Sequence, residues 1–313
     1  MKNIDSSFES KDLCCAGTLL LPGQGECPPV IVMAHGFAGV RAMLMPHARR
    51  FVEAGYAVYL FDYRSFGDSE GQPRHWVDPF RHLEDWDAAI RHVKSLPQVD
   101  GERMVLWGTS LSGGHVVCMA ARGHRIAAVI AGHPLMSGLA AVAHMPFLKV
   151  LRLTLAGVRD LAGSLIGRPH YLPVVGRPGD LAVLTGPEAW GGMQQLQAIV
   201  DGPWENKVLA RVALKIPRYN PIRKARQVRV PTPGNRWLEG QHRVGQGCAG
   251  GSEAYAQRAL HAARVGPLSA LLRGLPGRER AHAVGLPAHA RGGLRTYVSA
   301  PCARRWAWCR TSA

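Results

Sequence analysis

The chain has 313 residues, of which 47% are hydrophobic, and a formal net charge of +16 at pH 7. This length fits one large domain or one domain with a cap, and it can bury a full core without disulfides or structural metals. The polar N-terminus is not a secretory signal, and no apolar run approaches the roughly 20 residues of a membrane span. The seven scattered cysteines match no zinc site. We therefore expect a soluble protein of the reducing cytoplasm, without a membrane partner.

The positive charge is concentrated toward the C-terminus. Residues 233–313 contain 12 Arg, no Lys and 3 Glu, a net charge of +9, while the first 232 residues hold 26 basic and 19 acidic side chains, a net +7. Such an excess raises nucleic acid or an anionic surface as a partner. The Arg-rich segment lacks the interleaved aromatic residues on which single-strand binders stack bases, so we expect no nucleic-acid partner.

The first half of the chain alternates strand-like and helix-like segments. Short continuous apolar runs predict strands buried on both faces, and the apolar spacing from Phe80 to Val93 is helical. Alternating strands and helices favour an α/β fold, with a doubly wound, mostly parallel central sheet and helices on both faces. The predicted strands are 16–21, 29–34, 56–61, 103–107 and 125–131, and the predicted helices are 41–54, 79–95 and 112–121.

The pattern changes after His133-Pro134. Residues 135–222 contain helix-like segments broken by Pro and Gly, without a clear strand, which predicts a helical cap inserted after an N-terminal core of residues 1–134. Residues 223–232 resemble the start of a returning core strand. Aromatic and Met side chains of the cap are candidates for an acyl pocket, although cap core is the commoner role for each: Met145, Phe147, Tyr171, Trp190, Met193 and Trp204.

The clearest chemical motif is WGTSLSGG at residues 107–114, between a predicted strand and a predicted helix. A serine in so tight a turn needs small residues two positions away on either side, and Gly108 and Ser112 meet this need. The turn lifts the Ser110 hydroxyl out of the sheet and directs the helix N-terminus at developing negative charge. The alternative is a Gly/Ser-rich turn with no chemistry. We predict that Ser110 is a nucleophile.

Three motifs together resemble the α/β-hydrolase superfamily, nearest to the dienelactone-hydrolase and peptidase-S15-like esterases. They are His35-Gly36-Phe37 after a predicted strand, FDYRSFGDSEG at 61–71, and the elbow around Ser110. The resemblance covers residues 16–232. It implies an oxyanion hole formed by the backbone N–H groups of Phe37 and Leu111. His35 is then structural, while Gly36 and His133 are candidate substrate contacts.

The loop at 61–71 and most histidines favour structural roles. Asp62 and Arg64 are expected to satisfy backbone groups of a turn rather than to line the mouth of the pocket. Asp68 is not expected to be the triad acid, because its strand comes on the wrong side of the nucleophile in chain order. We expect His75, His82 and His92 to be solvated or structural, and His115 to pack on its helix; these four lie on or near the predicted helices.

The resemblance implies that an acid and then a histidine follow the cap, and neither is recognisable. No Asp occurs after Asp201, and residues 233–313 lack Lys, Ile and Phe. One interpretation is an irregular, poorly ordered basic tail. The other is a one-base frameshift near Thr232. Codons read in the shifted frame permit a strand-like PT-LVIAGSKD and, further on, Ala-His-Phe. His242, His261, His282 and His289 would then be accidental, as would Glu239, Glu253 and Glu279.

The resemblance implies a serine hydrolase that cleaves small carboxylic esters by two-step acyl transfer, without a metal or an organic cofactor. Three alternatives remain open. One is a peptidase or lactonase on the same fold. Another is a catalytically dead hydrolase fold acting as a binding protein. The third is an anionic-surface or nucleic-acid binder that uses the Arg-rich tail. The oligomeric state is not predicted.

Overall fold

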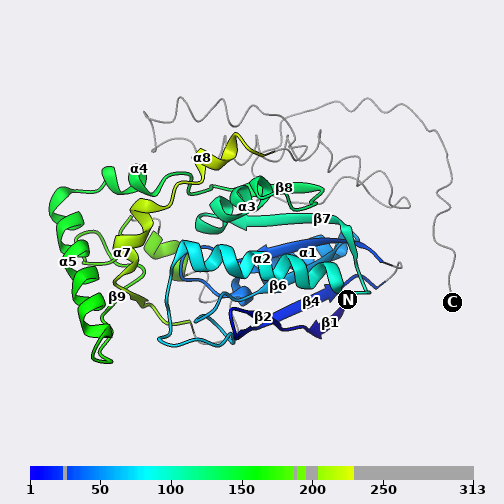
Figure 1. Cartoon of the computed structure of the whole chain (residues 1–313), viewed down its shortest axis with the longest axis horizontal. Helices are drawn as coiled ribbons and strands as arrows, with labels where there is room; N and C mark the ends of the chain where they lie inside the picture. Colours follow the sequence, from blue (N-terminus) through cyan, green and yellow to red (C-terminus); the bar gives the residue numbers. More distant parts are fainter. Residues whose placement is uncertain (24–26, 187–188, 195–203, 229–313) are drawn as a thin grey trace. The chain divides into compact units, whose positions relative to one another are not determined.

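The computed structural model describes residues 1–23, 27–186, 189–194 and 204–228 (Figure 1). All of them belong to the first of the two units into which the chain divides, Met1–Arg278. The predicted tail at 233–313 lies outside the described residues, so its order and the proposed frameshift remain predictions. Within the described part, no helix combines the length and hydrophobicity needed to cross a membrane.

A six-stranded sheet forms the centre of the core, in the order β1-β4-β6-β5-β7-β8. Strands β6, β5, β7 and β8 pair in parallel. At one edge of the sheet, β4 pairs antiparallel with β6, and β1 pairs antiparallel with β4. The predicted α/β fold with a mostly parallel sheet is therefore confirmed. The strands are β1 Lys2–Asp5, β4 Gly17–Leu21, β5 Pro29–Ala34, β6 Ala57–Phe61, β7 Asp100–Thr109 and β8 Ala128–Gly132.

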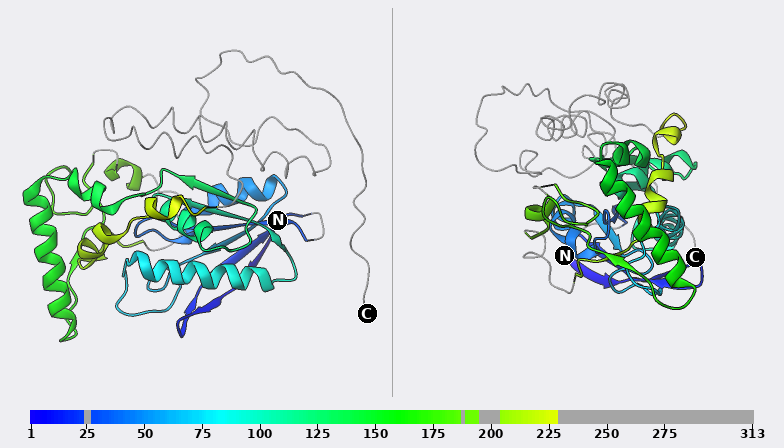
Figure 2. Two further views of the ribbon diagram at one scale, coloured as in Figure 1. Left: turned by 45° about the horizontal axis from the view of Figure 1, so that its top comes forward. Right: turned by 90° about the vertical axis from the view of Figure 1, so that its left-hand side faces the viewer.

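The central strands are apolar at every position because both faces of the sheet are covered. In β5, Val30 and Val32 belong to the cluster on one face, and Ile31 belongs to the cluster on the other. Successive side chains of a strand point to opposite faces, so a continuous apolar run serves both layers. Helix α1, Met45–Glu53, covers one face after the short 3₁₀ helix η1, Arg41–Leu44. Helices α2, Pro79–Ser95, and α3, Leu111–Ala121, cover the other (Figure 2).

The N-terminal segment holds more strand than its sequence predicted. Besides β1, a hairpin of β2, Phe8–Ser10, and β3, Leu13–Cys15, precedes β4. These strands are three or four residues long, and β1 is mostly exposed, so they carry no apolar alternation by which to recognise them. Their contacts come from distant segments: the Ser10 hydroxyl, for example, donates to Asp85 of α2 at 2.7 Å.

The region predicted as a cap contains helices and two short strands. The strand-free prediction was wrong here, because β9, Tyr171–Leu172, pairs antiparallel with β10, Val208–Leu209. Two residues per strand are too few to leave a periodic pattern. The helices are α4 Gly138–Ala143, α5 Phe147–Ser164 and α7 Val212–Lys215, followed by η2 Ile216–Arg218.

The return from the cap begins with a helix. Helix α8, Ile222–Ala225, includes the first residues of the segment predicted as a core strand at 223–232. That prediction was wrong for 223–225, where backbone hydrogen bonds from Lys224 and Ala225 to Pro221 close a helical turn. Residues 229–232 lie outside the described residues.

Candidate active site

Ser110 lies in a strained turn between the end of β7 and the start of α3. Its backbone has φ 55° and ψ −120°, a region that non-glycine residues occupy only when their surroundings hold them there. Its N–H donates to the Gly132 carbonyl at 2.8 Å, and its carbonyl accepts from the Leu135 N–H at 2.9 Å. These two bonds tie the turn to the end of β8.

The residues around the turn are small because backbone lies against them. A Cβ added to Gly108 would fall 2.4 Å from the Ser112 carbonyl oxygen, and one added to Gly114 would fall 2.5 Å from the Leu135 oxygen. Neither backbone atom can move aside without opening the elbow. Ser112 itself is fully buried and fits, which explains how serine replaces the more usual glycine at that position.

The Ser110 hydroxyl does not cap the helix that it precedes. Ser110 is the N-cap residue of α3, yet its side chain makes no capping hydrogen bond. The residue is exposed. Leu111 is the first residue of the helix, so its N–H has no intrahelical acceptor and points out of the helix N-terminus, where an oxyanion is stabilised. The hydroxyl and one N–H of the predicted oxyanion hole therefore come from adjacent residues.

The loop after β5 meets the same turn. A Cβ on Gly36 would lie 3.4 Å from the Ser110 Cβ and 4.0 Å from its Oγ, so Gly36 packs directly against Ser110. Phe37, whose N–H is the second predicted oxyanion donor, follows in this loop and is half-buried. The cap reaches the loop too, because the Trp204 indole donates to the Ala38 carbonyl at 2.7 Å.

His133 is exposed and has φ 43° at the end of β8. The residues that flank its segment, Gly132 and Leu135, make the two backbone hydrogen bonds that hold Ser110. The His133 backbone therefore lies beside the turn at Ser110, and a contact of His133 with substrate stays a prediction.

Three other histidines are enclosed below the elbow. His35 lies with its Nδ1 3.0 Å from the Gly36 carbonyl, His82 stacks on Tyr63 with centroids 3.9 Å apart, and the His115 Nδ1 is 2.8 Å from the Tyr219 hydroxyl. Burial lowers the pKa of His35, lowers that of His82 well below its ordinary value, and lowers that of His115 to about 3. These rings are neutral structural groups, as predicted for all three.

A series of hydrogen bonds from two aromatic residues supports the elbow, and no local sequence pattern indicates it. The Trp86 indole donates to the Tyr63 hydroxyl at 2.9 Å, and that hydroxyl donates to the Ser112 Oγ at 3.1 Å. The partners lie 23 and 49 positions apart, so no local spacing connects them. Because this series of hydrogen bonds ends at Ser112, two residues from Ser110, it ties the start of α3 to the sheet.

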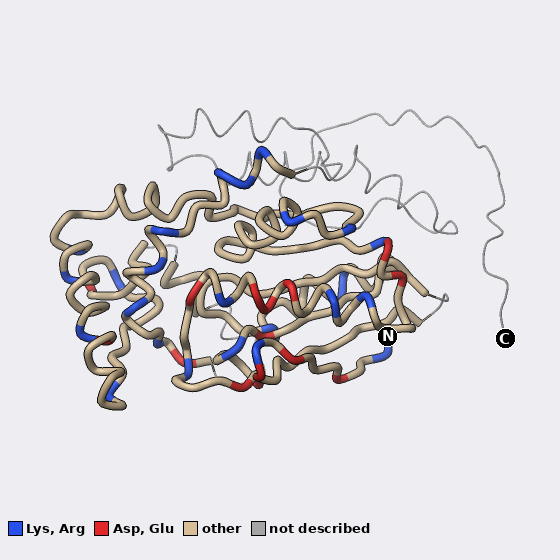
Figure 3. Tube along the Cα trace, viewed as in Figure 1, with Lys and Arg blue, Asp and Glu red and all other residues tan. Residues whose placement is uncertain are grey.

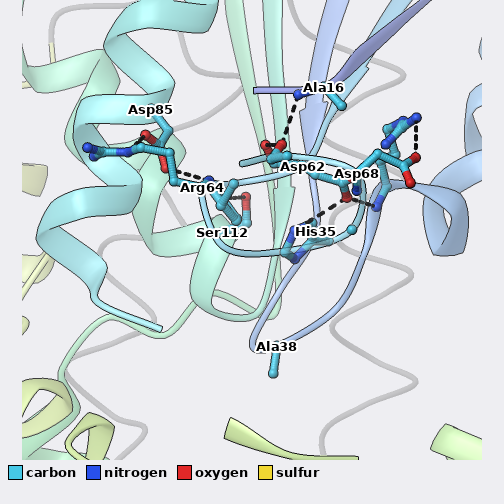
Figure 4. Close-up of polar contacts among 12 residues, drawn as sticks. Ala16, His35, Ala38, Asp62, Arg64, Asp68, Asp85 and Ser112 are labelled. Atoms are coloured by element: carbon cyan, nitrogen blue, oxygen red, sulfur yellow. Dashed lines mark hydrogen bonds and ion pairs between the residues drawn. The ribbon is translucent and has the colours of Figure 1, made fainter. Parts of the chain in front are cut away.

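Asp62 and Arg64 have the scaffold role expected of them (Figure 4). Asp62 accepts from the Arg41 N–H at 2.6 Å and pairs with the Arg41 guanidinium, while its carboxylate lies 3.9 Å from His35. Arg64 pairs with the fully buried Asp85 and with Glu84. Asp68 is largely exposed. The loop at 61–71 is thus a turn held by buried ion pairs.

The triad acid and base remain unassigned. The late histidines and glutamates considered for these roles all fall after residue 228, outside the described residues. Three of the described histidines, His35, His82 and His115, are buried, and no hydrogen bond joins any of them to Ser110 within the described residues.

Comparisons with known proteins agree with this geometry. Residues 26–168 match the family model described as serine aminopeptidase, S33. The quorum-quenching protein AidA of Acinetobacter baumannii is 41% identical over 230 residues, which cover 73% of this chain and 75% of that protein. The polyketide transferase af380 of Aspergillus fumigatus is 31% identical and aligns with 64% of this chain and 66% of its own length.

The same fold occurs among solved structures. The α/β hydrolase GrgF from Penicillium superposes with a TM-score of 0.63 at 26% identity, over 73% of this chain and 77% of that one. These matches support the superfamily and do not single out the dienelactone-hydrolase or S15 branches suggested by the motifs. With its sheet, its strained elbow and a relative of this identity and coverage, the chain belongs to the α/β-hydrolase family.

Proposed function

We propose that this hydrolase cleaves carboxylic esters of small molecules by two-step acyl transfer, with Ser110 as the nucleophile. The observation that carries the proposal is the strained backbone of Ser110, at φ 55° and ψ −120°, with a hydroxyl left out of the helix cap. Strain of this kind costs about 1–3 kcal/mol, and it is retained where it serves a purpose.

In the first step, the Ser110 Oγ attacks the ester carbonyl carbon, and a base takes the hydroxyl proton. Negative charge develops on the carbonyl oxygen, and the N–H groups of Leu111 and Phe37 stabilise it. Collapse of the intermediate expels the alcohol, which receives the proton, and leaves an acyl-serine. Water then attacks the acyl-serine, and the carboxylic acid departs.

The base and its acid partner belong, by the family pattern, to the chain after the cap. The sequence after Thr232 does not present them in recognisable form, and the proposed one-base frameshift there would account for it. The nucleotide sequence of the gene tests this: a shifted frame that contains stop codons or no strand-like run rules the frameshift out. If the printed chain is the true one, a fold without an activated nucleophile, acting as a binding protein, is the alternative.

Transfer of the acyl group to an acceptor other than water is a further candidate function. The relative af380 is named a polyketide transferase, and an acyl-serine can pass its acyl group to an acceptor other than water. The matching family model is described as a serine aminopeptidase, so a peptidase is an alternative function. A lactonase on the same fold is another. Cytoplasmic location and the absence of a nucleic-acid partner also remain proposals.

A fluorophosphonate probe tests for the nucleophile, because it labels only an activated serine. Wild-type protein is expected to be labelled, and Ser110→Ala is expected to lose the label completely. Ser95→Ala, which removes an exposed hydroxyl at the end of α2, is the matched control and should keep it. If the printed chain is unlabelled and the frame-corrected chain is labelled, the missing partners lie in the tail. If neither is labelled, the proposed function is wrong.

A further inference from the structure

Helix α5 of the cap is apolar on two opposite faces. Its inner face carries Leu153, Ala156 and Gly157, which are buried against the rest of the cap. Its outer face presents large side chains to solvent, including Phe147, which is 82% exposed, and Leu165 at the helix end, which is 87% exposed. A helix that is hydrophobic all round is normally covered on all sides. Figures 1 and 2 show α5 on the side of the cap away from the sheet.

The outer stripe of α5 is large. Its exposed members are Phe147, Leu148, Leu151, Leu155, Val158, Leu161, Leu165 and Ile166. Together their exposed parts amount to on the order of 800 Å², taking roughly 150–200 Å² for a fully exposed large side chain. The largest apolar patch of a typical monomer is about 300–600 Å². About 800 Å² is one partner's share of a standard protein interface.

The spacing of the stripe is that of a helix–helix seam. Leu148, Leu151, Leu155, Val158 and Leu165 follow the alternating steps of three and four residues that keep a row facing one partner helix, with Ala162 at the remaining position. The stripe is also nearly symmetric about its own midpoint, between residues 156 and 157. Such symmetry is what a two-fold contact requires, because the same surface must then complement itself.

We propose that α5 is the interface of a two-fold dimer, packed antiparallel against α5 of a second copy. The axis at the helix midpoint places Leu155 against Val158 of the second copy and Leu148 against Leu165. Leu151 then meets the small Ala162, so that a large side chain faces a small one. Phe147 meets Ile166, just past the end of the helix.

The charges along α5 agree with this register. Asp160, the one acidic residue of the helix, is fully buried and paired with Arg211 inside the cap. The Lys149 ammonium donates to Thr185 at 2.6 Å. The two exposed arginines do not meet each other across the axis, because Arg152 falls opposite Leu161, and Arg159 opposite Thr154. Figure 3 shows blue segments of Lys and Arg along this helix.

A second copy fits the stripe better than a lipid surface does. A helix that lies on a membrane has one apolar face and one strongly polar face, and it is commonly rich in Lys, Arg and Trp. Here the face opposite the stripe is the cap's own core, and the stripe holds a single aromatic residue, Phe147.

Sedimentation velocity of the full chain tests the proposal, independently of any activity. The expected species at about 10 µM has twice the chain mass. Leu155→Glu places a carboxylate at the axis beside its symmetry mate, so the dissociation constant should rise at least about 100-fold, leaving a monomer. Leu181→Glu changes another exposed leucine of the cap and should leave the dimer intact. Circular dichroism and thermal melting check that both variants fold.

Cysteine crosslinking tests the register even if Leu155→Glu fails to fold. The pair Leu155→Cys and Val158→Cys should give a reducible dimer well above the background of the native cysteines. Leu148→Cys alone should not give a crosslinked dimer, because residue 148 lies opposite Leu165 of the second copy and far from residue 148 of that copy. A wild-type monomer, a dimer that survives Leu155→Glu, or no increase in crosslinking by the pair overturns the proposal. So does a monomer whose binding to phosphatidylglycerol vesicles depends on Leu155.

Discussion

The core and the cap of this hydrolase are held together in different ways. In the core, apolar layers cover both faces of the sheet, and buried carboxylates such as Asp85 pin the loops at its edge. The described part of the cap has a small cluster around Leu153 and one ion pair in which both side chains are buried, Asp160–Arg211, and it leaves several large aliphatic side chains of α5 outward. We therefore predict that the part that carries Ser110 is the more stable one, and that the cap depends more on polar ties and, in the proposed dimer, on a second copy.

The largest expected effect is on stability. Asp85→Ala should cost about 3–5 kcal/mol of unfolding free energy, because it leaves the buried Arg64 guanidinium with only its half-exposed partner Glu84. Asp160→Ala should instead loosen the cap while the core keeps its amide protection. Urea unfolding and hydrogen exchange measure the two effects. Equal loss of core protection in both variants would show that core and cap unfold as one unit.

The contact between the loop at Gly36 and the turn at Ser110 should affect the catalytic rate more than the stability of the fold. In Gly36→Ala, the new methyl group lies 3.2 Å from the Thr109 carbonyl oxygen, so the backbone beside Ser110 must shift by a few tenths of an ångström. We expect kcat to fall about 10–100-fold, since catalysis is sensitive to displacements of this size. Gly132→Ala, whose methyl group meets Thr109 at an ordinary 3.4 Å, is the control. Equal rates for the two variants would argue against the Gly36 contact.

The buried histidines predict an acid-sensitive core. In the folded protein, burial keeps the pKa of His115 at about 3 and that of His82 well below its ordinary value, whereas in the unfolded chain both protonate below about pH 6.5. The unfolded state then binds more protons, so stability falls as the pH drops below that value, by up to about 1.4 kcal/mol per pH unit for each histidine.

Substitution of one histidine should reduce this pH dependence. Neither ring nitrogen of His82 has a hydrogen-bonding partner within the described residues, so His82→Phe removes two unsatisfied polar atoms and keeps the stack on Tyr63. The variant should lose less stability than wild type between pH 7 and pH 5, as measured by urea unfolding at each pH. An unchanged pH slope would mean that His82 does not stay neutral in the fold.

The smallest effect is expected where the cap touches the core. Trp204→Phe removes the hydrogen bond to the Ala38 carbonyl, worth about 1 kcal/mol, so kcat/KM should fall roughly fivefold with little change in the core. Trp190→Phe, at a cap tryptophan beside Arg177, is the control. A larger fall for Trp190→Phe would place the functional contact elsewhere in the cap.

The core was predictable because its signals are local. The run at β5 and the helical spacing of α2 identify their elements without knowledge of their neighbours, and the small residues around Ser110 mark the turn. The supports of that turn were not predictable. Tyr63, Trp86 and Ser112 meet only through the tertiary fold. Likewise, β9 and β10 are two residues long and separated by 35 positions, so they leave no periodic pattern.

Trapping the acyl-enzyme tests most directly whether Ser110 is the nucleophile of a working hydrolase. The full chain is incubated with an activated p-nitrophenyl ester and quenched in acid, and its peptides are mapped by mass spectrometry. We expect an acyl adduct on the peptide that contains Ser110, and we expect it to be absent from Ser110→Ala. Ester turnover that persists in Ser110→Ala, or an adduct at another residue, would contradict it.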